Sequence, residues 1–189
     1  MTFTLEDLAD QGDSPYLPHS SKEEVLLHSD FPEVIDNTAR EQFFVCPQKF
    51  FRSTINKLAP IYTSQHLHFG GAFATGLEHA RKAFYDGGYS QDDSITHGIH
   101  KAIQYFGDYQ PPEGSHKTSD NLILGLDYYG ETRPFASDHA KPHKLASGKS
   151  AIEFTFAIPL PINHPTTGNP LLYAGRFDML AEYQNCLFV

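Results

Sequence analysis

The sequence contains no tryptophan and only two cysteines, Cys46 and Cys186, which lie far apart along the chain. Two distant cysteines without a Cys-x-x-Cys pair exclude a disulfide framework and a zinc knuckle, and they are typical of a reducing compartment. No apolar run approaches the roughly 20 residues needed to span a bilayer, and the N-terminus has no secretory-signal pattern. We therefore expect a cytoplasmic protein without a membrane partner.

Basic residues are scarce, with 14 Lys and Arg against 23 Asp and Glu, for a formal net charge of −9. The acidity is concentrated in residues 1–40, which hold nine acids and two bases, whereas the remainder holds 14 acids and 12 bases. The sequence thus predicts an acidic, loosely ordered leader at residues 1–35 and one nearly neutral domain at residues 36–189. This balance leaves DNA binding open, since bound divalent cations supply positive charge where a phosphate sits.

The hydrophobic pattern changes its period along the domain, from helical in the first half to alternating in the second. A mixed α/β architecture of the α+β kind is therefore expected, with a helical N-terminal half packed on a sheet that begins with a β-hairpin. Gln184 and Asn185 are predicted to form a tight turn. Helices are expected at residues 36–58, 69–85, 92–106 and 119–129, and strands at 150–159, 171–183 and 186–189.

Two acidic residues lie on the predicted hairpin. If its turn is centred between residues 166 and 167, Glu153 faces Leu180, and Asp178 lies one diagonal step away on the same side. Two carboxylates in that arrangement suit a hard cation such as Mg²⁺. The alternative is that both are solvated charges on an exposed sheet face, where Arg176 pairs with Asp178.

Four short motifs occur in an order that resembles the RecB-like nucleases of the PD-(D/E)XK superfamily, over about residues 41–189. The resemblance implies a restriction-endonuclease-like fold, whose sheet is incomplete in this chain, and hydrolysis of DNA phosphodiesters in recombination, repair or phage DNA processing. Exonuclease activity is expected rather than endonuclease activity, in a bacterial or phage-infected cell. The motifs are a Cys-Pro helix at residues 43–51, a glycine-rich helix ending in His79, a strand with Glu153, and a Gly-x-x-Asp strand at 175–178.

The resemblance also implies a role for each matching residue. Asp178 would bind Mg²⁺ or Mn²⁺ directly, His79 would lie beside the metal from the helix behind the sheet, and Glu153 would be an additional acid near it. The alternative for His79 is a partly buried helix histidine. An iron–sulfur cluster with Cys46 as its first ligand is a further implication, and a structural thiol is the preferred interpretation of that residue.

The sequence departs from the family after Asp178, because no acid-x-lysine pair follows it. The chain is therefore expected to be a C-terminally truncated nuclease domain, inactive alone and dependent on a complementing segment or a helicase subunit. The alternative is a non-catalytic nucleic-acid-binding or interaction module, or a pseudoenzyme fragment. Outside these motifs, pairs of histidines at 66 and 68 and at 97 and 100 suggest zinc only weakly, and Tyr105, Tyr109, Tyr128 and Tyr129 are candidates for base stacking or plain packing.

Overall fold

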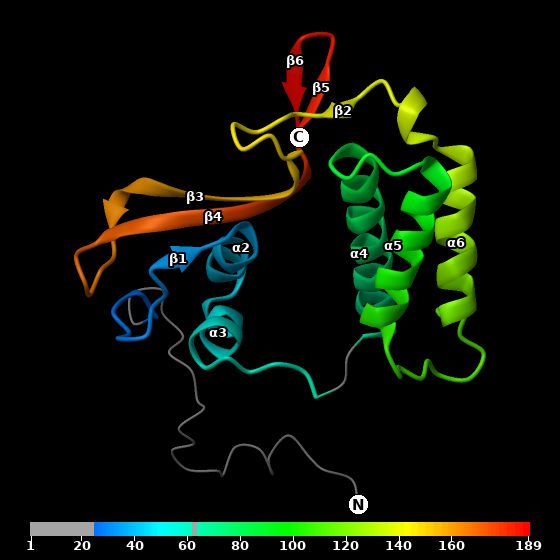
Figure 1. The fold of residues 1–189 in the computed structure, drawn as a ribbon. Helices are drawn as coiled ribbons and strands as arrows, with labels where there is room; N and C mark the ends of the chain where they lie inside the picture. The colour runs from blue at the N-terminus through cyan, green and yellow to red at the C-terminus, as the bar shows by residue number, and fades with distance from the viewer. Residues whose placement is uncertain (1–24, 62–63) are drawn as a thin grey trace, which may run out of the picture. The chain divides into compact units, whose positions relative to one another are not determined.

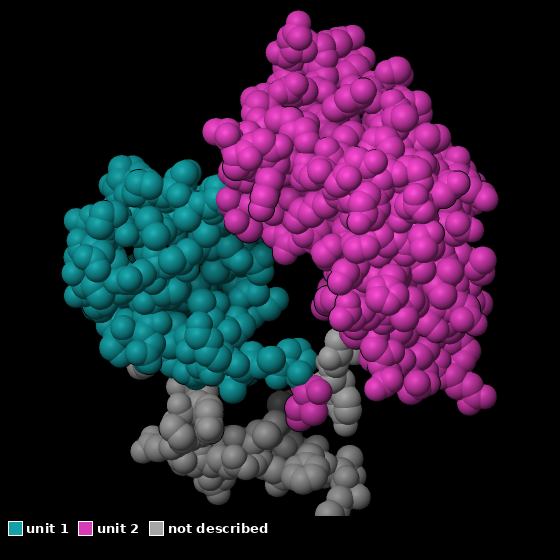
Figure 2. Space-filling view, in the orientation of Figure 1, with its two compact units in different colours: residues 1–60, 156–175 teal, residues 61–155, 176–189 magenta. Residues whose placement is uncertain are grey.

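A computed structural model describes residues 25–61 and 64–189 and divides the chain into two compact units. Unit 1 comprises residues 1–60 and 156–175, and unit 2 comprises residues 61–155 and 176–189 (Figure 2). Helices and strands are both present, in the order shown in Figure 1, which confirms the mixed α/β class. None of the helices in the described part of the chain has the length and apolar character needed to cross a membrane.

Unit 1 is built around an aromatic core. Its elements are β1 (Val34–Ile35), α2 (Asn37–Val45), α3 (Pro47–Phe50), a π-helical turn at Phe51–Ile55, and parts of β3 (Ile152–Asn163) and β4 (Pro170–Met179). Asp36 caps α2 by accepting from the backbone N–H of Ala39 at 2.6 Å. Pro47 begins α3, where its missing N–H costs nothing. The buried core residues are Val25, Phe31, Phe50, Phe51, Ile55 and Leu171, so residues of the predicted leader already contribute to packing.

The helices of unit 2 begin and end close to where their sequences predict. They are α4 (Gln65–Tyr85), α5 (Gln91–Phe106) and α6 (Ser119–Thr132). Side chains of Ser90 and Thr118 cap α5 and α6 by accepting from the N–H groups of Asp93 and Asn121. The three helices and the turn after α6 enclose two apolar clusters, whose buried members are Ala72, Ala80, Ile95, Ala102, Phe106, Leu122, Leu126 and Phe135.

Two small sheets complete the fold. One contains β1, β4 (Pro170–Met179) and β3 (Ile152–Asn163) in that order, with β1 parallel to β4. The other contains β2 (Lys141–Pro142), β5 (Ala181–Tyr183) and β6 (Cys186–Phe188), all antiparallel. Gln184 and Asn185 join β5 to β6 with φ of 49° and 61°. The predicted tight turn is confirmed, and both signs of φ match a type I′ turn.

The predicted strand at 171–183 is wrong in one respect, because it is interrupted at Leu180. The Leu180 carbonyl accepts a hydrogen bond from the His143 N–H at 2.8 Å. The Leu180 N–H donates to the Ala151 carbonyl at 2.9 Å. These bonds direct the backbone from β4 into the second sheet, so β4 and β5 belong to different sheets. The helical region predicted at 36–58 is divided at Cys46, whose extended backbone separates α2 from α3, and this agrees with the break that the sequence predicts at Pro47.

Candidate functional site

A cavity of about 420 Å³ in unit 2 brings together acidic side chains from a helix and from the hairpin strands. Glu78 comes from α4, Glu153 from the start of β3, and Asp178 from the end of β4. Among the described residues that line this cavity, Arg176 of β4 is the only basic one. The remaining lining residues are Gly71, Ala74, Thr75 and Tyr105.

One face of α4 forms the helical wall of this cavity. Gly71, Ala74, Thr75 and Glu78 recur at intervals of three and four residues, which places them along one stripe of the helix. The first three are small and leave space above the helix. A Cβ added at Gly71 would lie 2.6 Å from the Tyr105 hydroxyl, so glycine is needed for the close approach of that side chain. Glu78 is the first charged residue of the stripe and reaches the cavity.

Arg176 links the helical and the strand carboxylates. Its Nη2 lies 3.3 Å from Oε2 of Glu78, and its Nε donates to Glu153. The other oxygen of Glu78 accepts from Lys82 Nζ at 2.6 Å, one helical turn away. The two glutamate side chains are only 17% and 12% exposed, whereas Arg176 is 56% exposed. Largely buried carboxylates require such partners, because desolvation of an unpaired charge is costly.

Glu153 has an unusual backbone for a strand residue, with φ of 53°. A non-glycine residue at positive φ is strained and is retained where surrounding contacts hold it. The register differs on the two sides of it: His164 N–H donates to the Asn169 carbonyl near the turn, whereas Leu180 N–H donates to Ala151 at the open end. The bond near the turn matches the predicted centre between residues 166 and 167, whereas Leu180 pairs with Ala151, two residues before Glu153. The predicted placement of Glu153 opposite Leu180 is therefore wrong.

A difference of two residues in pairing keeps a side chain on the same face, so Glu153 lies on the side of the hairpin that carries Asp178. Both residues line the cavity, as the sequence argument expects, although by a different register. Asp178 is exposed and makes no ion pair or side-chain hydrogen bond with any other described residue. Arg176 therefore does not pair with Asp178, and the arrangement leaves one carboxylate open to solvent beside two that are neutralised.

The glycine of the Gly-x-x-Asp motif has a packing role. A Cβ at Gly175 would lie 2.6 Å from two ring atoms of Phe156, so any side chain there would displace the aromatic ring of the opposite strand. Phe156 also lies against Tyr173, with ring centroids 6.1 Å apart. Gly175 thus permits a close cross-strand contact three residues before the aspartate.

His79 lies elsewhere than predicted. It does not line the cavity that contains Asp178, and its ring lies 5.9 Å from the ring of His97 on α5. Burial lowers the pKa of His79, and the neighbouring Glu78 carboxylate only partly opposes that effect. These observations describe a partly buried histidine between two helices, and the adjacent residue on α4, Glu78, is the one that lines the cavity with Glu153 and Asp178.

Within residues 25–61 and 64–189, no group of three or more His, Cys, Asp or Glu side chains is already arranged to hold a metal ion. The cavity carboxylates match Mg²⁺ in donor type, since this cation takes oxygen ligands, but Arg176 holds two of them. Among the weaker sequence candidates, His68 contacts the Phe106 carbonyl at 3.0 Å and stacks on Tyr109, which is a structural role. Cys46 is a free, partly exposed thiol.

Comparison with family models, with curated proteins and with solved structures finds no match to this chain. The site therefore rests on its own geometry. The sequence predicts Glu153 and Asp178 in this site but does not predict Glu78. The small-residue stripe from Gly71 to Glu78 was the signal for the missing residue, because a helix face that is small for two turns and then acidic indicates a wall of a cavity.

Proposed function

We propose that the chain is the N-terminal part of a divalent-metal-dependent DNA nuclease of the RecB-like PD-(D/E)XK kind, with a restriction-endonuclease-like fold. An exonuclease role in recombination, repair or phage DNA processing follows from the same resemblance. The observation that supports this proposal is the convergence of Glu78, Glu153 and Asp178 on one cavity, from a helix and from both strands of the hairpin. Oxygen donors from such elements suit Mg²⁺ or Mn²⁺.

In this proposal Asp178 and Glu78 hold the cation, and Glu153 orients its water ligands. When bound, Mg²⁺ or Mn²⁺ supplies a Lewis acid that polarises a phosphoryl oxygen and lowers the pKa of an attacking water. Arg176 has two roles: it neutralises both glutamates without the cation, and it offers an exposed guanidinium to a DNA phosphate once it leaves them. His79 contributes by packing α4 against α5.

Cleavage requires more than these residues. In the family that the sequence resembles, a second acid and a lysine follow the aspartate, and no acid-x-lysine pair follows Asp178 here. In this proposal the cavity residues bind the cation, and cleavage depends on an acid and a lysine in addition to them.

Direct measurement of Mn²⁺ binding by calorimetry or electron paramagnetic resonance tests the site without requiring cleavage. Asp178→Asn and Glu78→Gln should each weaken Mn²⁺ binding by about tenfold or more, because each removes a charged oxygen ligand. His79→Gln should leave it unchanged. Asp127→Asn and Glu131→Gln, at exposed positions of α6, are the charge-matched controls. Unchanged binding by Asp178→Asn would refute the assignment.

The second candidate is a non-catalytic nucleic-acid-binding or interaction module. Arg176 favours it, because its contacts with Glu78 and Glu153 make the cavity self-neutralising without any cation. DNA binding that is the same in EDTA and in Mn²⁺, together with no measurable Mn²⁺ binding by the chain, would favour this candidate over the nuclease.

A further inference from the structure

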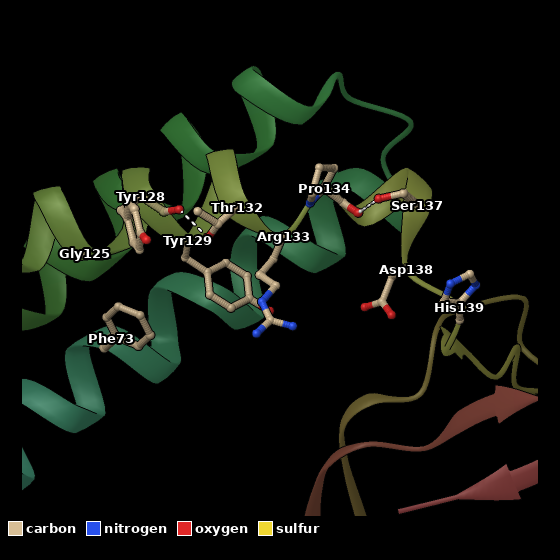
Figure 3. A pocket seen from close by; sticks show the side chains of 10 residues that line it. All are labelled: Phe73, Gly125, Tyr128, Tyr129, Thr132, Arg133, Pro134, Ser137, Asp138 and His139. Carbon is tan, nitrogen blue, oxygen red and sulfur yellow. Dashed lines mark hydrogen bonds between the residues drawn. The ribbon is translucent and has the colours of Figure 1, made fainter.

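A groove of about 830 Å³ lies in unit 2, outside the candidate site, and is larger than the acidic cavity. Its walls are α4, α6 and the segment that follows α6 (Figure 3). Aromatic side chains line one end, where Figure 3 shows the rings of Phe73, Tyr128 and Tyr129, and polar side chains of the following segment line the other. The remaining lining residues are Gly125, Thr132, Arg133, Pro134, Ser137, Asp138 and His139.

The aromatic end presents ring surface to solvent. Tyr128 is 68% exposed, although it is a large aromatic residue in the middle of a helix. The Tyr129 ring is fixed in position by α4, because its hydroxyl accepts a hydrogen bond from Arg81 at 3.0 Å. Gly125 lies one helical turn before Tyr129 and has no side chain to cover the groove. A Cβ added at Gly125 would lie 3.4 Å from the Phe73 ring. The groove therefore has a flat aromatic floor and an exposed ring at its edge.

The polar end carries an available positive charge. Arg133 is exposed, and within the described residues its guanidinium makes no salt bridge and no side-chain hydrogen bond. The hydroxyls of Thr132 and Ser137 are satisfied internally, by the carbonyls of Tyr128 and Pro134. Asp138 accepts from the Ala140 N–H at 3.2 Å. Arg133 is thus the guanidinium at this end that is open to a ligand, and the exposed His139 side chain beside it likewise makes no hydrogen bond or ion pair with another described residue.

Exposed aromatic faces next to a free guanidinium form the combination that binds single-stranded nucleic acid: bases stack on the rings and the backbone phosphate pairs with the cation. We infer that this groove holds a single-stranded DNA segment, with one base stacked on Tyr128 and the adjoining phosphate at Arg133. The Asp138 carboxylate repels a second phosphate at its end of the groove, and it can accept a hydrogen bond from a base amino group. The inference rests on the proposed function for its choice of DNA as the ligand.

The test is fluorescence anisotropy of a labelled short oligothymidylate, titrated with the full chain in EDTA at low salt. Tyr128→Ala should weaken binding by about tenfold or more, the size of one lost base stack. Tyr128→Phe retains the ring and should bind like the unaltered chain. Arg133→Gln should weaken binding and lower the slope of log K against log salt by about 0.7, as expected for one phosphate contact to a single strand.

Matched controls separate the groove from general surface effects. Tyr89 is a similarly exposed tyrosine, on the loop before α5, and Arg52 is an exposed arginine of unit 1. Tyr89→Ala and Arg52→Gln should bind like the unaltered chain. The inference is overturned if the chain binds no oligothymidylate, if Tyr128→Ala and Arg133→Gln bind normally, or if Tyr128→Phe loses as much affinity as Tyr128→Ala.

Failure of this inference and failure of the proposed function give different results. Because the titration contains EDTA, groove binding does not depend on the metal site, and Asp178→Asn should leave it intact. If the unaltered chain binds the oligothymidylate in the groove as expected but does not bind Mn²⁺ in the acidic cavity, the result counts against the nuclease proposal alone. Mn²⁺ binding that depends on Asp178, with no effect of Tyr128 or Arg133 on the oligothymidylate, would count against the groove alone.

Discussion

Substitution of Gly98 by alanine should destabilise unit 2, although alanine is the better helix former. A Cβ at Gly98 would lie 2.5 Å from the Gly76 carbonyl oxygen and 2.8 Å from the Ala80 Cβ. Both neighbours belong to α4, and a backbone carbonyl cannot rotate away as a long side chain can. The two helices would have to separate, which costs about 1–3 kcal/mol or more as overpacking, against a propensity gain of about 1 kcal/mol. We expect a net loss of about 1–2 kcal/mol.

Gly125→Ala is the matched control because it makes the same chemical change in another helix of the same unit. Its added Cβ would meet only the Phe73 ring, at 3.4 and 4.0 Å, which is close to ordinary van der Waals contact. The helix-propensity gain should then prevail, and the variant should be more stable by about 0.5–1 kcal/mol. The two variants are expected to differ in stability by about 1.5–3 kcal/mol.

Urea denaturation followed by circular dichroism measures both variants, since α4, α5 and α6 provide most of the helical signal of unit 2. The midpoint should fall for Gly98→Ala and rise for Gly125→Ala. If Gly98→Ala were as stable as the unaltered chain, α4 and α5 would not be in contact at Gly76 and Gly98. The position of Glu78, two residues after Gly76, would then lose its structural support.

Three further predictions follow from single contacts. Phe135→Ala should cost about 3–5 kcal/mol in urea denaturation, because this ring is 2% exposed at the centre of an aromatic cluster. Burial raises the pKa of Asp86, but hydrogen bonds from Lys144 and Ser150 outweigh it and lower that pKa. The stability that Asp86 contributes is therefore present above its unfolded pKa of about 3.9 and is lost as pH falls through the lower folded value, so Asp86→Asn should flatten acid denaturation below about pH 4. Arg176→Gln should lower stability in EDTA by about 1 kcal/mol and strengthen Mn²⁺ binding in calorimetry, because it frees the two glutamates of the cavity; equal Mn²⁺ affinity would contradict competition by the guanidinium.

Local patterns were sufficient to predict much of the fold. The amphipathic stripes and the caps at Ser90 and Thr118 specify α5 and α6, because capping and periodicity act within a few residues. The turn at Gln184 and Asn185 is similarly local. The interruption at Leu180 was not predictable, since it depends on hydrogen bonds with His143 and Ala151, which are distant in sequence.

The candidate site shows the same division between local and distant information. Glu153 and Asp178 were found because alternation along two strands indicates which side chains share a face. The pairing of Leu180 with Ala151 was not predicted, because it accompanies a positive φ at Glu153, a conformation that a non-glycine residue does not signal in the sequence. Glu78 was omitted because the motif resemblance directed attention to the histidine beside it.

The choice between Glu78 and His79 as the helical ligand follows from the geometry of α4. Consecutive residues on an α-helix point about 100° apart, so Glu78 and His79 leave α4 in different directions. Glu78 contacts Arg176 of β4, and His79 lies against His97 of α5. A rotation of α4 that brought His79 to Asp178 would turn Gly76 away from Gly98 and place bulkier residues at the closest approach of the helices. The packing of α4 on α5 therefore favours the glutamate over the histidine as the residue of α4 that shares a cavity with Asp178.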